Sequence, residues 1–173
     1  MARERVMAEV APWTVVRRKT ELVLRLERRQ GPLKTVLGSL VARGIKVMAH
    51  CSFSDWNGTT LLLVVENDLL ARQILEAAGF KYRTESVVLV EASRETGGAA
   101  RLGHSLADAG IDVVYSYVAM AGDEKLAAVF KTVNDDAAVR VLQDHSDKVN
   151  RTTFGPASVT APGSTVALPK PEF

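Results

Sequence analysis

The sequence predicts an α+β protein made of two βαββαβ units, each with an antiparallel sheet and helices packed on one face. Two observations support this class. Segments in which apolar and polar residues alternate, as in strands, are followed along the chain by segments whose apolar residues recur at helical spacing, and the reverse. The same succession of residues then recurs about 66 positions later. Of the 173 residues, 47% are hydrophobic, which is ample for a packed core and excludes a wholly disordered chain.

The first unit begins with a strand over residues 20–27, in which Leu22, Leu24 and Leu26 share one face. A helix follows Gly31-Pro32, because apolar residues then recur at helical spacing, and Gly44 ends it. The next elements are a strand over 45–53, a hairpin turn at Asn57-Gly58, a strand over 59–65, a helix capped by Asp68 and ended by Gly79, and a strand over 84–91. This order is the ferredoxin-like arrangement.

The second unit is predicted from an internal duplication. A shift of 66 residues superposes Gly31 on Gly97 and Gly44-Ile45 on Gly110-Ile111, and a shift of 67 superposes Asn67-Asp68 on Asn134-Asp135. Such a repeat indicates two copies of one structural unit. The predicted elements are a strand around 87–90, a helix over 98–109, strands over 112–120 and 125–132, a helix over 135–143 and, as the only candidate for a closing strand, Lys148–Phe154.

These elements predict four regions along the chain. We expect an N-terminal extension over 1–18, a first domain over 19–86, a second domain over 87–145 and a flexible tail over 146–173. The tail is rich in Pro, Ser and Thr and shows neither helical nor strand periodicity.

Composition and charge indicate a cytoplasmic protein without a membrane or nucleic-acid partner. Cys51 is the single cysteine, which favours a reducing compartment, and no apolar run approaches the about 20 residues of a membrane-spanning helix. Residues 1–30 hold eight Lys or Arg and four Asp or Glu, so the basic excess lies at the amino end. A dedicated nucleic-acid surface would instead concentrate this charge on the folded body.

The duplicated loops resemble those of the ACT domain, a small regulatory ligand-binding module. That family carries a loop of the form Asn-x-Pro-Gly-x-Leu before its first helix and Gly-Ile-Asn-Ile on its second strand. The first copy here reads Gln30-Gly31-Pro32-Leu33 and later Gly44-Ile45-Lys46-Val47, and the second reads Thr96-Gly97-Gly98-Ala99 and later Gly110-Ile111-Asp112-Val113. The stretch Val113–Tyr117 is also similar to small bacterial proteins made only of two ACT domains.

The resemblance, which covers residues 20–143, implies a non-catalytic sensor. ACT pairs generally place their sheets edge to edge and often bind an amino acid where the loop of one subunit meets its neighbour. We therefore expect a homodimer or higher homo-oligomer, no cofactor, no metal, and an unidentified protein partner that receives the signal. The implied ligand-binding residues are Gln30, Gly31, Pro32, Leu33, Lys46, Thr96, Gly97, Gly98 and Asp112.

The chemistry of these residues suits an amino acid. A helix N-terminus presents unpaired amides and a positive dipole end to a carboxylate. Gly31 and Gly97 have no side chain that could cap those amides, although glycine there also serves a tight turn. Pro32 lacks the N–H that Gly98 retains, and Asp112 can accept from an ammonium group that Lys46 would repel. These differences predict that the second copy is the better site.

Three other functions compete with a sensor. Catalysis is disfavoured, because His50, His104 and His145 have no metal-ligand spacing and the chain contains no nucleophile elbow or phosphate loop. RNA binding is disfavoured, because the strands over 21–27 and 59–65 contain no aromatic residue on which a base could stack. A ligand-free assembly module remains the alternative interpretation.

Overall fold

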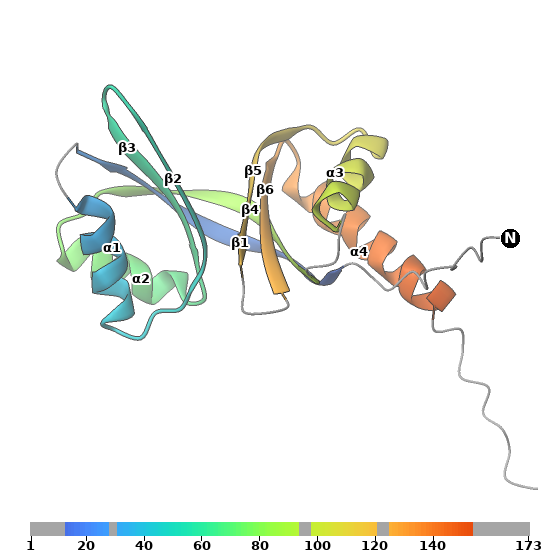
Figure 1. The fold of residues 1–173 in the computed structure, drawn as a ribbon, viewed down its shortest axis with the longest axis horizontal. Coiled ribbons are helices and arrows are strands. Elements are labelled where there is room, and N and C mark those ends of the chain that lie inside the picture. The colour runs from blue at the N-terminus through green and yellow to red at the C-terminus, as the bar shows by residue number, and fades with distance from the viewer. Residues whose placement is uncertain (1–12, 28–30, 94–97, 121–124, 154–173) are drawn as a thin grey trace, which may run out of the picture.

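A computed structural model describes residues 13–27, 31–93, 98–120 and 125–153 (Figure 1). Six strands and four helices lie in these ranges, and they belong to the two predicted units. The elements in chain order are β1 Trp13–Leu26, α1 Pro32–Val41, β2 Val47–Asp55, β3 Gly58–Val65, α2 Asp68–Ala77, β4 Tyr82–Ser93, α3 Gly98–Asp108, β5 Val113–Met120, β6 Lys125–Thr132 and α4 Asp135–Thr153.

All six strands form one antiparallel sheet in the order β2-β3-β1-β4-β6-β5. The predicted α+β class with two ferredoxin-like units is confirmed. The first unit is the four-strand set β2-β3-β1-β4, and the second is the equivalent set β5-β6-β4-β1. The two sheets are therefore continuous, because β1 and β4 belong to both units.

The strand that closes the second unit comes from the beginning of the chain. The first half of β1 pairs with β4 in the register Val16↔Val90 and Thr20↔Ser86. The prediction of a closing strand over 148–154 was wrong, since α4 continues to Thr153 where a helix only to residue 143 was expected. The expected extension over 1–18 and tail from 146 also differ from the structure, because strand residues begin at Trp13 and residues 146–153 are helical.

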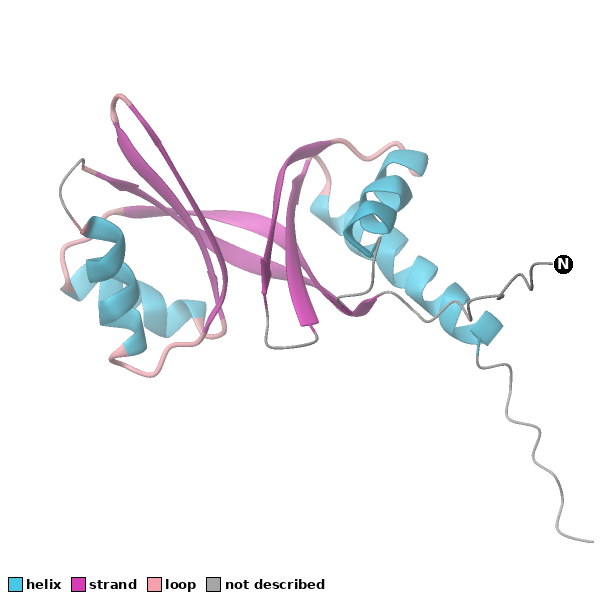
Figure 2. Cartoon of the chain, viewed as in Figure 1, coloured by secondary structure: helices cyan, strands magenta, loops and turns pink. Residues whose placement is uncertain are grey.

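The helices form two groups, one against each half of the sheet (Figure 2). A hydrophobic core lies between the sheet and each group. In the first, Leu22 and Leu63 of the sheet pack with residues of α1 and α2. In the second, Val88 of β4 packs with residues of α3 and α4, and Val16 of β1 joins this core. Val16 and Leu22 are separated by an even number of residues in one strand and so lie on the same face of the sheet. All four helices thus cover one face.

A third core lies on the opposite face of the sheet, on which none of the four described helices packs and which we call the helix-free face. It consists of Ala49, Val64, Val87, Leu89, Ala127 and Val129, with Met48, Tyr117 and Ala119 packed against it. The sheet coils so strongly that its edge strand β2 contacts β5 and β6 of the other unit. The helix-free face is therefore buried at its centre between the two units.

The duplicated residues adopt duplicated local structures. Gly44 and Gly110, which follow the first helix of each unit, both have the left-handed φ values, 73° and 68°, that favour glycine. The Asn67 and Asn134 side chains accept hydrogen bonds from the amides of residues 70 and 137, each at 3.0 Å. Asn67 is thus the cap of α2, where the sequence predicted Asp68. These matches show that the repeat in sequence is a repeat in structure.

Candidate functional site

The first predicted ligand loop leads to a helix start without a side-chain cap. Gly31 is the N-cap of α1, has φ 83° and is exposed, and no side chain in the described ranges forms a capping hydrogen bond there. The α2 helix, by contrast, has its first turn capped by Asn67. Pro32 is the first residue of α1, and Leu33 is half-buried against the first core.

The second predicted loop lies mostly outside the described residues, and so does one residue of the first. Gln30, Thr96 and Gly97 belong to these undescribed parts of the chain. Gly98 is the first residue of α3. The N-cap of α3 therefore stays a prediction, whereas the start of α1 is an observation.

Lys46 and Asp112 occupy equivalent positions just before β2 and β5. The carbonyl of Lys46 accepts from the Glu66 amide at 3.0 Å, the carbonyl of Asp112 accepts from the Val133 amide at 3.1 Å, and both residues are exposed. Gly31 and Lys46 lie at opposite ends of α1, whose ten residues rise about 15 Å. The structure thus does not bring the loop and the following strand start of one unit together.

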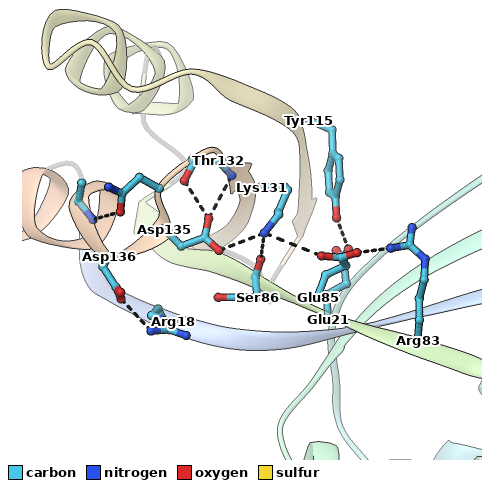
Figure 3. A network of polar contacts seen from close by, with 12 residues as sticks. Arg18, Glu21, Arg83, Glu85, Ser86, Tyr115, Lys131, Thr132, Asp135 and Asp136 are labelled. Atoms are coloured by element: carbon cyan, nitrogen blue, oxygen red, sulfur yellow. Dashed lines mark hydrogen bonds and ion pairs between the residues drawn. The ribbon is translucent and has the colours of Figure 1, made fainter.

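The centre of the helix-free face holds a polar cluster that the sequence did not predict. The Glu21 side chain on β1 is fully buried. The Tyr115 hydroxyl donates to Glu21 Oε2 at 2.5 Å and the Tyr117 hydroxyl to Oε1 at 2.7 Å (Figure 3 shows the first of these contacts). Because both tyrosines belong to β5, the cluster ties the first strand of one unit to an edge strand of the other.

Burial controls the ionisation of this cluster. Burial raises the pKa of Glu21, and the hydrogen bonds from Tyr115 and Tyr117 oppose this effect only in part. Burial and the nearby Glu21 carboxylate raise the pKa of both tyrosines, which remain protonated donors at neutral pH. The cluster is therefore a carboxyl group with two fixed O–H donors and no cation in direct hydrogen-bond contact among the described residues.

A second polar network runs beside it from β4 to the start of α4 (Figure 3). The Lys131 ammonium donates to the Ser86 carbonyl at 2.9 Å and to Asp135 Oδ2 at 3.3 Å, and lies 3.9 Å from Glu85 Oε2. Asp135 also accepts from the amide and hydroxyl of Thr132. Burial would raise the pKa of Asp135, but these hydrogen bonds outweigh it and the pKa is lowered.

The duplication provides the signal that could have identified the Glu21 cluster. A shift of 66 residues relates Glu21 to Val87, and relates Ala49 and Cys51 to Tyr115 and Tyr117. Val87 and Ala49 share the third core. The contact of the Glu21 carboxylate with two tyrosine hydroxyls, which joins the two copies, is thus equivalent to an apolar contact of Val87 with the Ala49 region. Because Glu21 is equivalent by the duplication to Val87 of the core, its position could have been recognised as buried.

Metal and membrane functions find no support in the described ranges. No group of three or more His, Cys, Asp or Glu side chains in these ranges is placed to hold a metal ion. No helix there has the length and apolar character needed to cross a membrane.

The family follows from a comparison with known proteins. A family model described as an ACT domain pair matches residues 18–151. The chain belongs to this family. The resemblance in the duplicated loops is thereby confirmed, over a slightly longer range than the expected residues 20–143. A search among curated proteins found no match for this ACT pair.

Solved structures share the fold of this ACT pair. Protein BT0572 from Bacteroides thetaiotaomicron is 22% identical with a TM-score of 0.66, over 75% of this chain and 89% of that one. The regulatory subunit of aspartate kinase from Thermus thermophilus is 15% identical with a TM-score of 0.54, over 78% and 98%. The structure of aspartokinase alpha and beta subunits is 18% identical with a TM-score of 0.53, over 78% of this chain and 99% of that one. At these identities the similarity establishes the fold.

Proposed function

We propose that this ACT pair is a non-catalytic sensor that binds an amino acid at its strand-to-helix loops and passes the signal to a partner protein. Membership of the ACT family supports a regulatory, ligand-sensing role in general. The structurally similar Thermus thermophilus protein is itself a regulatory subunit, described in a ligand-free form. The single cysteine favours a reducing compartment, so we place this activity in the cytoplasm.

The uncapped start of α1 carries this proposal. The first amides of a helix need acceptors, and most helices supply them with a side chain, as Asn67 does for α2. At Gly31 no side chain of the described residues does so, and among these residues no atom beyond the glycine's own chain neighbours lies within 4 Å of the place where a Cβ would stand. A ligand carboxylate can therefore approach the backbone and the positive end of the helix dipole.

The second half of each site must come from another unit or another subunit. The ammonium group of an amino acid lies only a few ångströms from its carboxylate, whereas α1 separates Gly31 from Lys46 by about 15 Å. We propose that the loop residues Gln30, Gly31, Pro32 and Leu33, or Thr96, Gly97 and Gly98, face Lys46 or Asp112 of a neighbouring copy. The proposed sensor is accordingly a homodimer or a higher homo-oligomer.

Asp112 distinguishes the two kinds of site. Its exposed carboxylate can accept from a ligand ammonium, whereas Lys46, at the equivalent position, repels it. We propose that sites with Asp112 bind the amino acid more tightly. An Asp112→Lys variant should lose binding, and an Asp144→Lys variant, which makes the same charge change at an exposed position of α4, should keep it.

A thermal-shift screen of the twenty amino acids tests the proposal. A ligand at 100 times its Kd stabilises the folded state by about 2.7 kcal/mol, which corresponds to several degrees in Tm for a chain of this length. A shift with one amino acid that Asp112→Lys abolishes and Asp144→Lys preserves would support the site. Equal binding by both variants would refute the role of Asp112.

A ligand-free assembly module is the second candidate, and the edge strand β5 favours it. Val114, Val118 and Met120 are 61%, 52% and 59% exposed on this strand, which pairs with β6 on one side and with no other strand of the described residues. Exposed apolar side chains on an open edge invite strand pairing with another chain. If no amino acid shifts the Tm while Val118→Lys dissociates an oligomer in light scattering, assembly is the better description.

A further inference from the structure

An open cavity of about 420 Å³ lies at the outer ends of β1, β3 and β4, away from the loop and strand positions discussed above. The residues that line it include Val23, Arg25, Thr60 and Arg83. Val23 pairs with Arg83 and lies two residues from the buried Glu21 on β1. The cavity therefore belongs to the helix-free face.

Three cationic residues line this cavity. Arg25 and Arg83 lie on neighbouring strands and Lys81 immediately precedes β4, two residues from Arg83. Neighbouring positions on one face of a sheet are roughly 5–8 Å apart, so the three charges repel one another. No acidic residue is among the described residues that line the cavity.

The neighbouring carboxylates compensate this charge incompletely. Arg25 donates to Asp55 Oδ1 at 2.5 Å and to the Thr60 hydroxyl at 2.6 Å, and Arg83 forms an ion pair with Glu85. Lys81 forms no ion pair with any residue in the described parts of the chain. The Arg25 and Arg83 side chains are 45% and 65% exposed, and ion pairs of such exposure are weak enough to exchange for a ligand.

We propose that this cavity binds a small multivalent oxyanion, one that carries phosphate or several carboxylate groups. Guanidinium groups recognise such oxygens with two parallel N–H donors, and the ammonium of Lys81 adds a third positive charge. The Thr60 hydroxyl supplies a neutral donor and Val23 an apolar contact. This site is separate from the amino-acid site proposed above and does not depend on it.

The polar network gives the anion a route to the second unit. Arg83 pairs with Glu85, and the Glu85 carboxylate also lies 3.9 Å from Lys131, which contacts Asp135 at the start of α4. An anion that pairs with Arg83 displaces Glu85 from it. The Glu85 carboxylate then keeps its contact with Lys131 but loses the one with Arg83. Occupation of the cavity in the first unit thereby changes the charge balance at the start of α4 in the second.

Titration calorimetry of the full chain with pyrophosphate and, separately, with citrate tests the site. Chloride at equal ionic strength serves as the blank. We expect at least one probe to bind, and Lys81→Gln and Arg83→Gln each to weaken its Kd about tenfold or more. Lys125→Gln, which removes an exposed charge at the start of β6, should leave the Kd unchanged, and Lys81→Arg should retain binding.

The outcomes separate the possible sources of the ligand chemistry. Binding of pyrophosphate alone assigns a phosphorylated ligand, and binding of citrate alone assigns a polycarboxylate. Absence of binding above the chloride blank, or equal weakening by Lys81→Gln and Lys125→Gln, would overturn the proposal. Asp112→Lys should leave anion binding intact, so failure here is distinguishable from failure of the amino-acid site.

Discussion

Removal of a single hydroxyl, in Tyr117→Phe, tests whether the Glu21 cluster stabilises the contact between the two units. The ring of Tyr117 packs in the third core and is preserved in the variant, so the change removes only the 2.7 Å hydrogen bond to Glu21. A hydrogen bond to a charged group contributes about 1.5–3 kcal/mol. We therefore expect this loss in the free energy of unfolding, or roughly 3–10 °C in Tm.

The chain provides a matched control for this change. Each of its three tyrosines donates to a glutamate, and Tyr82 does so to Glu76 at 2.5 Å near the surface. Water can replace the Tyr82 hydroxyl as a donor, whereas the fully buried Glu21 has no such substitute. Tyr82→Phe should therefore cost at most about 1 kcal/mol. Tyr115→Phe should resemble Tyr117→Phe.

The cost should depend on pH, and the pKa of Glu21 gives the sign. Burial raises this pKa in the folded protein, so the folded state keeps a proton that the unfolded state has lost. Stability then falls as pH rises above about 4.3, where an unperturbed glutamate ionises, until Glu21 ionises in the folded protein also. Removing a donor raises the pKa further. Tyr117→Phe should therefore cost more at pH 8 than at pH 5, and Glu21→Gln should abolish this difference.

Urea unfolding followed by circular dichroism at pH 5 and pH 8 measures these effects. The decisive comparison is between Tyr117→Phe and Tyr82→Phe at pH 8, because both lose the same chemical group. If the two variants were equally stable, or if the cost of Tyr117→Phe were the same at both pH values, the buried carboxylate would not stabilise the interface as described.

Three further predictions concern the loops, the caps and the shared strand. Gly31→Asp should weaken amino-acid binding in calorimetry more than Gly31→Asn, because both side chains fill the space beside the helix start but only the Asp carboxylate repels the ligand carboxylate; equal effects would argue against an anion at this helix start. Asn67→Ala and Asn134→Ala should each lower the free energy of unfolding by about 1 kcal/mol in urea titrations, and a neutral result would show that these caps do not stabilise their helices. A chain that begins at residue 19 lacks the part of β1 that pairs with residues 88–92 of β4, so hydrogen exchange should show lost protection of the β4 amides that bond to β1. Unchanged protection there would contradict the shared-strand arrangement.

Local periodicity predicted most of the fold. The alternation of Leu22, Leu24 and Leu26 gave the first strand, and helical spacing after Gly31 gave α1 within about one residue of its observed ends. The duplication then predicted the second unit. Without it, β5 would be harder to assign, because apolar and polar residues alternate only weakly in its sequence. Periodicity relates residues that are close in the sequence, and the duplication relates residues at a fixed offset. Both can therefore be recognised without knowledge of the fold.

The closing strand could not be predicted in this way. Trp13–Lys19 contains two consecutive valines and then three consecutive basic residues, so it lacks strict alternation. It forms a strand because β4, some 70 residues later, offers it a hydrogen-bonding partner. The polar end of α4 was missed for a related reason, since Ser146–Thr153 continues the helix without an extended apolar stripe. In both cases distant or neighbouring structure decides the conformation, and local pattern does not.

The candidate site was predicted in part. Gly31 has the bare helix start that its residue type suggested, and Asp112 and Lys46 have equivalent positions. The separation of Gly31 from Lys46 was not predicted, because it depends on the direction of α1 relative to the strands. Glu21 alternates with Leu22 on β1 and so lies on the other face of the strand, and only the coiling of the sheet, which brings β5 over it, makes that face an interior.

The sharing of β1 and β4 leaves the protein without a linker between its halves. A hinge requires a segment that few contacts cross, whereas here β1 and β4 pair without a register shift from Val15 to Leu24. Relative movement of the halves must therefore be a change in the twist of one sheet. Calorimetric melting should accordingly show a single cooperative transition, and neither half could be exchanged for a foreign domain without carrying a strand of the other.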